Sequence, residues 1–451
     1  MRSQIAAHRV FLVAFVCGAT LRVVVMLGYR WQMWFPDSYG YLTTARHPVA
    51  GVIRPSGYPL LLWSLRPLHS FALVTGVQHA MGLGIGVMVY ALSRRNHVPA
   101  WGATLAAAPM LFDAYEVQLE HLVMSDTLFG FLIAGAVTVM LWRYEVTPWS
   151  SMATGALLGL AAVVRTVGLP LLAVFVVFLL ARRVAWRSVA VAAAACLLPV
   201  AAYAGWFTAG QHQFGLNGST GIFLYSRTMS FADCARIRPP GQERLLCVPT
   251  PQGTRTASLI WSDLSPLRLL PGARFASYKD RLAGDFALRT IQAQPLDYLS
   301  AVGTDVARTF QVGHPAFPDP QTYRYYLFRP YAVAPPMNAV RTVRSYGHGP
   351  AETRVVQPYA GVLRTYQRYV YVPGVLFGLI MVVGLAGIIT RWRRLGGRAS
   401  LPWGVALALI VIPPVTAGFD YRYVLPALAP ACVAAALAAR DLRSASTASG
   451  S

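Results

Sequence analysis

The chain contains ten apolar runs, each about long enough to cross a lipid bilayer, and no other feature restricts its fold as strongly. A helix needs about 20 apolar residues, within a range of about 17–25, to span the hydrocarbon core. The runs lie at 10–29, 70–93, 98–114, 122–142, 151–166, 167–182, 187–208, 371–390, 401–418 and 423–439. Because the backbone of a segment in lipid must hydrogen-bond to itself, we expect these runs to be helices. The sequence therefore predicts an all-α polytopic membrane protein.

The composition agrees with a membrane protein. The 451 residues are 55% hydrophobic and 12% charged, whereas soluble domains are about 25% charged. The formal net charge is +22, and among the 39 lysines and arginines only Lys279 is a lysine. An arginine can bind a phosphate group through two parallel hydrogen bonds, which a lysine cannot. Since these arginines are scattered between the apolar runs and form no basic tract, we expect no nucleic-acid partner.

Charges in the connections orient the predicted spans. Connections on the cytoplasmic side carry an excess of lysine and arginine. If the N-terminus is cytoplasmic, ten spans place the basic connections at 94–95, 143, 182–187 and 391–398 on that side, together with Arg440 and Arg443. We therefore expect a multi-pass protein of the cell membrane with both termini in the cytoplasm. The extracytoplasmic segments are then 30–69, 115–121, 165–168, 209–370 and 419–422.

The spacing of the runs divides the chain into four parts. These are a transmembrane module at 1–208 with a first outer loop at 30–69, an extracytoplasmic cap at 209–370, C-terminal transmembrane helices at 371–442, and a disordered Ser/Ala-rich tail at 443–451. The cap is too long to be a plain connector. An apolar stripe predicts helices over 274–312, divided at Pro295. Cys234 and Cys247 both lie in the cap, so we expect a disulfide if it faces an oxidising compartment.

Ionisable residues collect where the outer connections meet the spans. Asp37 follows the first span in the sequence Phe35-Pro36-Asp37-Ser38-Tyr39-Gly40-Tyr41. The others at this level are Arg54, Glu120, His121, Asp126, Arg165 and Arg422. A carboxylate can take the proton of an attacking hydroxyl, and arginines can neutralise a departing phosphate. Since the sequence has no Gly-rich nucleotide loop, this combination predicts transfer of a sugar from a lipid-linked phosphate.

The order of these motifs resembles that of GT-C fold glycosyltransferases, in particular the bacterial relatives of protein O-mannosyltransferases and of the aminoarabinose lipid A transferase. Residues Asp37 to Leu42 are similar to the acidic motif of the first loop, and Arg54 to Pro59 to the segment that closes it. Further matches are Glu120 to Asp126, Arg165, and Arg422 to Pro426, in the same order as in the family. Many relatives have Asp-Glu in the first loop, whereas here Ser38 follows Asp37.

The resemblance implies a GT-C-like helix bundle and a polyprenyl-phosphate sugar donor, for example of mannose or arabinose. It implies an inverting single displacement with Asp37 as the general base and an envelope glycan, lipid or protein as the acceptor. No cofactor is required, a divalent metal is optional, and no metal ligands are assigned. The expected donor-phosphate residues are Arg54, Arg165, Arg422, Tyr41 and Tyr58, and the expected acceptor or sugar residues are Ser56, Glu120, His121 and Asp126.

Each residue also has a structural interpretation. Asp37 could cap a helix that begins at Ser38, and Arg422 could form an ordinary salt bridge with Asp420. Arg54 and Arg165 could extend to the membrane interface, where the tyrosines would form an aromatic belt. Asp126 could pair with an arginine, and Glu120-His121 could bind a metal, although adjacent residues diverge on a helix. For the whole protein, the alternatives are a transporter or flippase of lipid-linked sugar, which would carry charges at the membrane midplane, or a structural subunit of an envelope complex.

Overall fold

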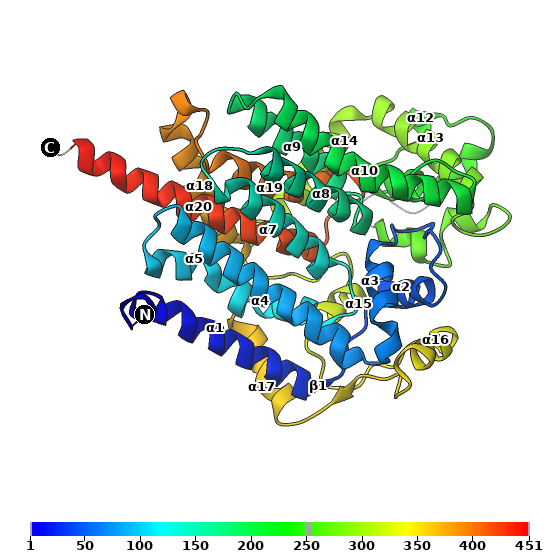
Figure 1. Cartoon of the computed structure of the whole chain (residues 1–451). Helices are drawn as coiled ribbons and strands as arrows, with labels where there is room; N and C mark the ends of the chain where they lie inside the picture. Colours follow the sequence, from blue (N-terminus) through cyan, green and yellow to red (C-terminus); the bar gives the residue numbers. More distant parts are fainter. Residues whose placement is uncertain (1, 249–254, 256, 450–451) are drawn as a thin grey trace.

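The computed structural model describes residues 2–248, 255 and 257–449, and helices make up nearly all of its regular structure (Figure 1). The first half contains α1 (Arg2–Gly28), α2 (Pro36–Arg46), α3 (Gly57–Leu65), η1 (Arg66–Leu68), α4 (Phe71–Arg95), α5 (Ala100–Phe112), α6 (Ala114–His121), α7 (Asp126–Trp142), α8 (Pro148–Val164), α9 (Gly168–Ala181) and α10 (Trp186–Gln211). The middle contains α11 (Thr220–Thr228), α12 (Cys234–Ile237), η2 (Gly241–Leu246), η4 (Ala257–Trp261), η5 (Pro266–Arg268), α13 (Ser277–Ala293), α14 (Pro295–Arg308), α15 (Pro320–Tyr323) and η6 (Arg324–Tyr326). The chain continues with α16 (Met337–Gly347), α17 (Tyr359–Tyr369), α18 (Gly374–Thr390), η7 (Trp392–Arg394), α19 (Ser400–Thr416) and α20 (Tyr421–Ser449).

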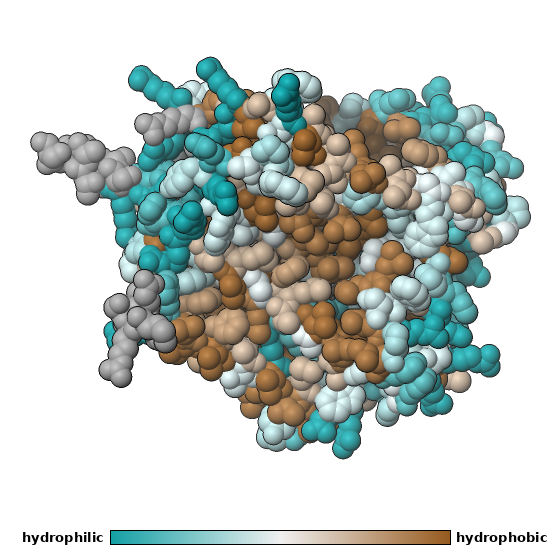
Figure 2. Space-filling model, viewed as in Figure 1, coloured by the Kyte–Doolittle hydropathy of each residue, from teal (hydrophilic) through white to brown (hydrophobic). Residues whose placement is uncertain are grey.

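The apolar helices form one bundle with a different composition at each end. Within it, α8 packs on α7 and α10, α20 packs on α18 and α19, and α4 packs on α5 and α7. Figure 2 shows a band of hydrophobic residues across the middle of the visible face, between two hydrophilic ends. In Figure 1 the two chain termini lie at one end, and α2, α3, α12, α13 and α16 lie at the other. We call this second end the outer end.

All ten apolar runs are helical, but they differ in length. Four helical segments are long and apolar enough to cross a membrane: His8–Gly28, Phe71–Arg95, Trp186–Gln211 and Tyr421–Arg443. A fifth crossing results if α17 and α18, which meet at an angle of 54°, are taken as one bent span. The shorter apolar helices are α5, α7, α8, α9 and α19. The structure is therefore that of a helical membrane protein, and the count of ten spans stays a prediction.

Polar residues cut several of these helices short at the outer end. Helix α7 begins at Asp126, and α8 ends one residue before Arg165. The turn after Arg165 is tight enough to require Gly168, since a Cβ atom there would lie 2.5 Å from the backbone nitrogen of Ala162. The residues that interrupt the apolar pattern are thus the ones that the sequence analysis selects as candidates for the site.

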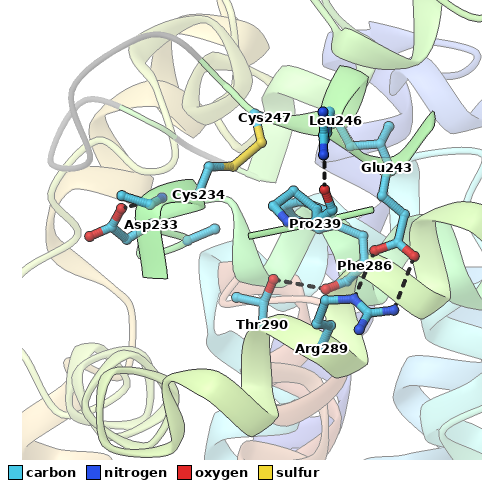
Figure 3. Close-up of a disulfide and its surroundings, with 12 residues drawn as sticks. Asp233, Cys234, Pro239, Glu243, Leu246, Cys247, Phe286, Arg289 and Thr290 are labelled. Carbon is cyan, nitrogen blue, oxygen red and sulfur yellow. Dashed lines mark hydrogen bonds and ion pairs between the residues drawn. A yellow bond between two sulfur atoms is a disulfide. The ribbon is translucent and has the colours of Figure 1, made fainter. Parts of the chain in front are cut away.

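The cap has a small core of its own. Tyr225 of α11 packs edge-to-face on Phe286 of α13, with ring centres 5.4 Å apart. As predicted, the helical region divides at Pro295, where α14 begins. Cys234 and Cys247 form a disulfide with their Cα atoms 6.1 Å apart (Figure 3). This disulfide joins two connecting segments that contain little regular structure, next to the longer helix α13.

Two further features complete the fold. The short strands β1 (Tyr29–Arg30) and β2 (Arg354–Val355) pair antiparallel, which connects the end of α1 to the segment before α17. Helix α20 continues to Ser449, so residues 443–449, which the sequence analysis assigned to a disordered tail, belong to a helix. An existing helix extends at low cost, and residues 443–449 contain no proline or glycine that would end it. Residues 450–451 lie outside the described part of the chain.

Candidate active site

Asp37 lies in the first turn of α2, but another residue closes the start of this helix. The hydroxyl oxygen of Ser38 accepts a hydrogen bond of 3.0 Å from the backbone N–H of Phe35. Pro36 occupies the first helical position, where its fixed φ angle suits a helix start. Ser38 therefore takes the capping role that the structural interpretation gave to Asp37. It also gives a local reason for the serine at position 38.

The carboxylate of Asp37 is held between two arginines. Arg54, from the first outer loop, places Nη2 2.8 Å from Oδ1, and Arg422, from the first turn of α20, places Nη1 2.8 Å from Oδ2. Asp37 and Arg422 are 385 positions apart in the sequence. Only 9% of the Asp37 side chain is exposed, compared with 26% of Arg54 and 7% of Arg422. Two motifs from opposite ends of the chain thus meet at one acid.

The two arginines keep Asp37 ionised. Burial alone would raise the pKa of its carboxyl group, because desolvation disfavours the charged form. The positive charges of Arg54 and Arg422 outweigh this effect, with a smaller contribution from Arg165, and the pKa is lowered. At neutral pH the side chain is therefore a carboxylate that can accept a proton.

Arg422 is fixed from several sides. Its Nε donates to Asp420 at 3.2 Å, which is the salt bridge that the sequence analysis considered. Its guanidinium carbon lies 4.7 Å from the ring centre of Phe35 and 5.1 Å from that of Tyr423. Burial raises the pKa of Asp420, although the charge of Arg422 opposes this shift. Arg422 therefore bridges two acids and lies between two aromatic rings.

Arg54 is less constrained. Besides Asp37, it faces the ring of Trp261 in the cap, with a distance of 5.9 Å from the guanidinium carbon to the ring centre. It is also the most exposed of the three candidate arginines, since Arg165 is 17% exposed. Arg54 is therefore the arginine that can most easily turn toward a ligand. The contact with Trp261 shows that the cap forms one side of the site.

Arg165 and Asp126 form the second ion pair of the cluster. Nη1 of Arg165 donates to Oδ1 of Asp126, a fully buried carboxylate, whereas Oδ2 has no hydrogen-bond partner among the described residues. The guanidinium carbon of Arg165 lies 5.0 Å from the ring centre of Tyr423, the ring that Arg422 also faces. Of the alternatives for Asp126, the structure shows the pair with an arginine. Arg165 and Arg422 therefore lie beside one shared ring.

The other first-loop candidates are occupied by internal contacts. The hydroxyl of Tyr41 lies 3.0 Å from Oγ of Ser125, the hydroxyl of Tyr58 donates to Oε1 of Gln78 at 2.5 Å, and both tyrosine side chains are buried. Ser56 Oγ accepts from the backbone N–H of Gly51 at 2.8 Å. These contacts give all three residues a structural role in supporting α2 and α3. The expected roles of Tyr41 and Tyr58 in donor binding, and of Ser56 in acceptor or sugar binding, stay predictions.

Glu120 and His121 belong to a different cluster. Glu120 accepts hydrogen bonds of 2.6 Å and 2.8 Å from Arg22 of α1 and lies 2.7 Å from Nδ1 of His79. Nδ1 of His121 lies 3.0 Å from His79, and its Nε2 lies 2.6 Å from the backbone oxygen of Tyr29. Burial first, and His79 second, lower the pKa of His121 to about 3. These groups therefore form a buried polar network with partners inside the protein, and their expected role at the acceptor stays a prediction.

The sequence analysis missed Arg22, which holds Glu120. A signal was present, since a charged residue in the middle of an apolar run is costly and is almost always paired.

Among the described residues, no group of three or more His, Cys, Asp or Glu side chains is arranged to hold a metal ion.

The chain was compared with known proteins at three levels. No protein-family model matches it, and no curated protein sequence does. Solved structures with a similar backbone include the archaeal oligosaccharyltransferase AglB from Archaeoglobus fulgidus, in complex with an inhibitory peptide and a dolichol-phosphate. The sequence identity is 14% and the TM-score is 0.45, and the match covers 97% of this chain and 50% of the AglB chain. They also include ArnT from Cupriavidus metallidurans bound to undecaprenyl phosphate, at 13% identity and a TM-score of 0.39 over 99% of this chain and 79% of that one.

The present chain thus spans half the length of the AglB chain. At these identities and scores the similarity describes only the path of the backbone. The chemistry of the site has to be argued from the residues of this chain.

Proposed function

We propose that this protein is an integral-membrane glycosyltransferase. It moves a sugar from a polyprenyl-phosphate donor to a hydroxyl group of a cell-envelope glycan, lipid or protein on the extracytoplasmic side. The observation that carries the proposal is the Asp37 carboxylate between Arg54 and Arg422 at the outer end of the bundle. A base and phosphate-binding groups are the two parts that this reaction needs.

The different exposures of the two arginines support different tasks for them in the proposed reaction. A donor phosphate competes with Asp37 for guanidinium N–H groups, and an arginine has five such donors. Arg54, at 26% exposure, can turn to the phosphate, whereas Arg422 is held by Asp420 as well as by Asp37. Charge-assisted hydrogen bonds of this kind are about twice as strong as neutral ones. The arginines therefore stabilise the negative charge that the leaving phosphate develops.

Donor binding also prepares the base. When Arg54 moves to the phosphate, Asp37 loses one of the two cations that lower its pKa. Its pKa then rises, and it becomes a stronger base at the moment when the sugar is in place. The acceptor oxygen forms a bond to the anomeric carbon, the bond from that carbon to the phosphate oxygen breaks, and the hydroxyl proton passes to Asp37. One displacement of this kind inverts the anomeric centre.

The test is transfer of a radiolabelled sugar by the purified protein in lipid nanodiscs. Polyprenyl-phosphate mannose and polyprenyl-phosphate arabinose are the donors, and an envelope extract with its lipids, glycans and proteins supplies the acceptor. The wild type should transfer label from one donor, and Asp37→Ala should not. Asp263→Ala is the matched control. This aspartate lies in the cap, its side chain is 88% exposed, and it forms an ion pair with the nearby Arg268.

Equal transfer by the wild type and by Asp37→Ala would refute the proposed role of Asp37 and with it the proposed mechanism. Absence of transfer, combined with movement of lipid-linked sugar across sealed vesicles, would instead support the transporter.

A further inference from the structure

A second hollow at the outer end is separate from the Asp37 cluster. It has a volume of about 560 Å³ and lies where the turn between α8 and α9 meets the first segment of the cap. Its lining includes Thr166, Gln213, Phe214, Asn217, Asp280 and Arg281. Sites for small molecules have volumes of about 300–1,000 Å³. This hollow, which we call the cap pocket, is therefore large enough for a sugar unit or two.

The walls of the cap pocket are continuous with the segments that carry the site arginines. Thr166, on one wall, directly follows Arg165. On the other wall, the backbone N–H of Gly218 donates to the carbonyl of Val52 at 2.7 Å, and Ser219 Oγ donates to the carbonyl of Ile53 at 2.8 Å. Ile53 precedes Arg54 in the sequence. The cap pocket therefore adjoins the backbone that positions both Arg54 and Arg165.

The side chains of the cap pocket suit a neutral ligand with many hydroxyl groups. Phe214 is 89% exposed and offers an aromatic surface to the apolar face of a sugar ring. Asn217 Oδ1 accepts from the backbone N–H of Ser219 at 3.2 Å and from Thr220 Oγ1 at 3.0 Å, so its amide N–H₂ group is left to donate. The side chains of Gln213 and Arg281 add further polar groups to the lining. Such a set can hydrogen-bond to neighbouring hydroxyls.

An anionic ligand fits this pocket less well. The start of a helix normally attracts negative charge, and α11 begins at Thr220 in the lining. Asp280 already occupies this position, because its Oδ1 accepts a hydrogen bond of 2.9 Å from the backbone N–H of Ile222. A second anion would meet the Asp280 carboxylate, and Arg281, the next residue in the lining, already has this carboxylate as a charged neighbour.

We infer that the cap pocket binds a neutral carbohydrate, which is the glycan part of the acceptor. The identification as acceptor rests on the proposed function, whereas binding of the carbohydrate does not. The acceptor is then a glycan or a glycolipid rather than an unmodified protein.

Saturation-transfer NMR on the full-length protein in nanodiscs tests the binding. The probes are methyl glycosides of mannobiose, maltose, lactose and arabinobiose, with glucose 6-phosphate and a neutral hexapeptide for comparison. At least one neutral glycoside should give a signal that Phe214→Ala weakens about two- to twelvefold, since an aromatic contact contributes about 0.5–1.5 kcal/mol. Leu264→Ala, at a cap residue that is 84% exposed and outside the pocket lining, should keep the signal. Asp37→Ala should keep it too.

Three results would overturn the inference: no signal from any neutral glycoside, equal signals in the wild type and Phe214→Ala, or stronger binding of glucose 6-phosphate or of the peptide. Because the measurement needs no donor, it separates this inference from the proposed function. If glycosides bind but no sugar is transferred, the cap pocket is a carbohydrate site and the proposed transferase function is wrong. If the protein transfers sugar and Phe214→Ala does not change the acceptor KM, the transferase function stands and the cap pocket is not the acceptor site.

Discussion

Replacing Asp37 by asparagine tests the proposed base with the smallest change of shape. The variant keeps the size of the side chain and removes its negative charge, so Arg54 and Arg422 lose a shared anion. A donor phosphate can still reach both guanidinium groups. The asparagine, however, cannot take the proton of the acceptor hydroxyl. We therefore expect donor binding to persist and the chemical step to fail.

The magnitude has a catalytic and a structural part. Loss of a general base slows a reaction about 10²- to 10⁴-fold, which corresponds to about 3–5 kcal/mol of activation free energy. Removing one partner of a fully buried ion pair costs about 3–5 kcal/mol of stability. Here the cost should be smaller, because Arg422 keeps Asp420 and Arg54 is partly screened by solvent. The folded state should therefore survive while the transfer rate collapses.

The assay is single-turnover transfer at saturating donor, with the thermal unfolding midpoint measured on the same samples. Asp420→Asn is the matched control, since it also removes a carboxylate from Arg422 but has no contact with Arg54 among the ion pairs of the site. It should destabilise the protein to a similar degree and lower the rate much less. If Asp37→Asn transfers sugar as fast as Asp420→Asn, Asp37 is not the base.

Further predictions concern other residues of the site and the cap. Arg54→Ala should raise the donor KM, and it should also shift the acid limb of kcat/KM to higher pH. In the wild type the lowered pKa of Asp37 keeps the active carboxylate present as the pH falls, and activity is lost only as the pH passes through that lowered pKa. An acid limb that stays in place in Arg54→Ala would show that another group titrates. Glu120→Gln should lower the free energy of unfolding by about 3–5 kcal/mol, because a buried ion pair with Arg22 is lost. Denaturant unfolding measures this change, and the acceptor KM should stay the same. A raised acceptor KM with normal stability would instead place Glu120 in the acceptor site. Replacing both Cys234 and Cys247 by serine should destabilise the cap by about 2–4 kcal/mol. The fluorescence of Trp261, the single tryptophan in the sequence of the cap, can measure this during thermal unfolding. Unchanged unfolding would mean that the disulfide adds nothing to the stability of the cap.

The sequence predicted the helices well because their causes are local. A run of apolar residues forms a helix in lipid wherever it occurs, and a proline such as Pro295 marks a new helix start by its own geometry. Helix length was harder to predict. Hydropathy extends a run up to the next strongly polar residue, whereas the backbone of α7 and α8 turns at Asp126 and Arg165, which have partners elsewhere.

The candidate site was predicted in part for the same reason. Asp37, Arg54 and Arg422 stand out in the sequence because a charge beside an apolar run needs a partner or a function. Tyr41 and Tyr58 carried no comparable signal, since an aromatic residue at a membrane interface is as common in packing as in binding. The structure shows their hydroxyl groups in contact with Ser125 and Gln78.

The sequence by itself determined the class of protein, the order of its helices and the gathering of acids and arginines near the span ends, because hydropathy and charge act over short stretches of chain. Only the tertiary structure decided which charge meets which. Asp37 meets an arginine 385 positions away, and Glu120 is paired with Arg22 of the first helix. Ion pairs form between groups that helix packing brings within about 4 Å, and that proximity is a property of the folded bundle rather than of neighbouring residues.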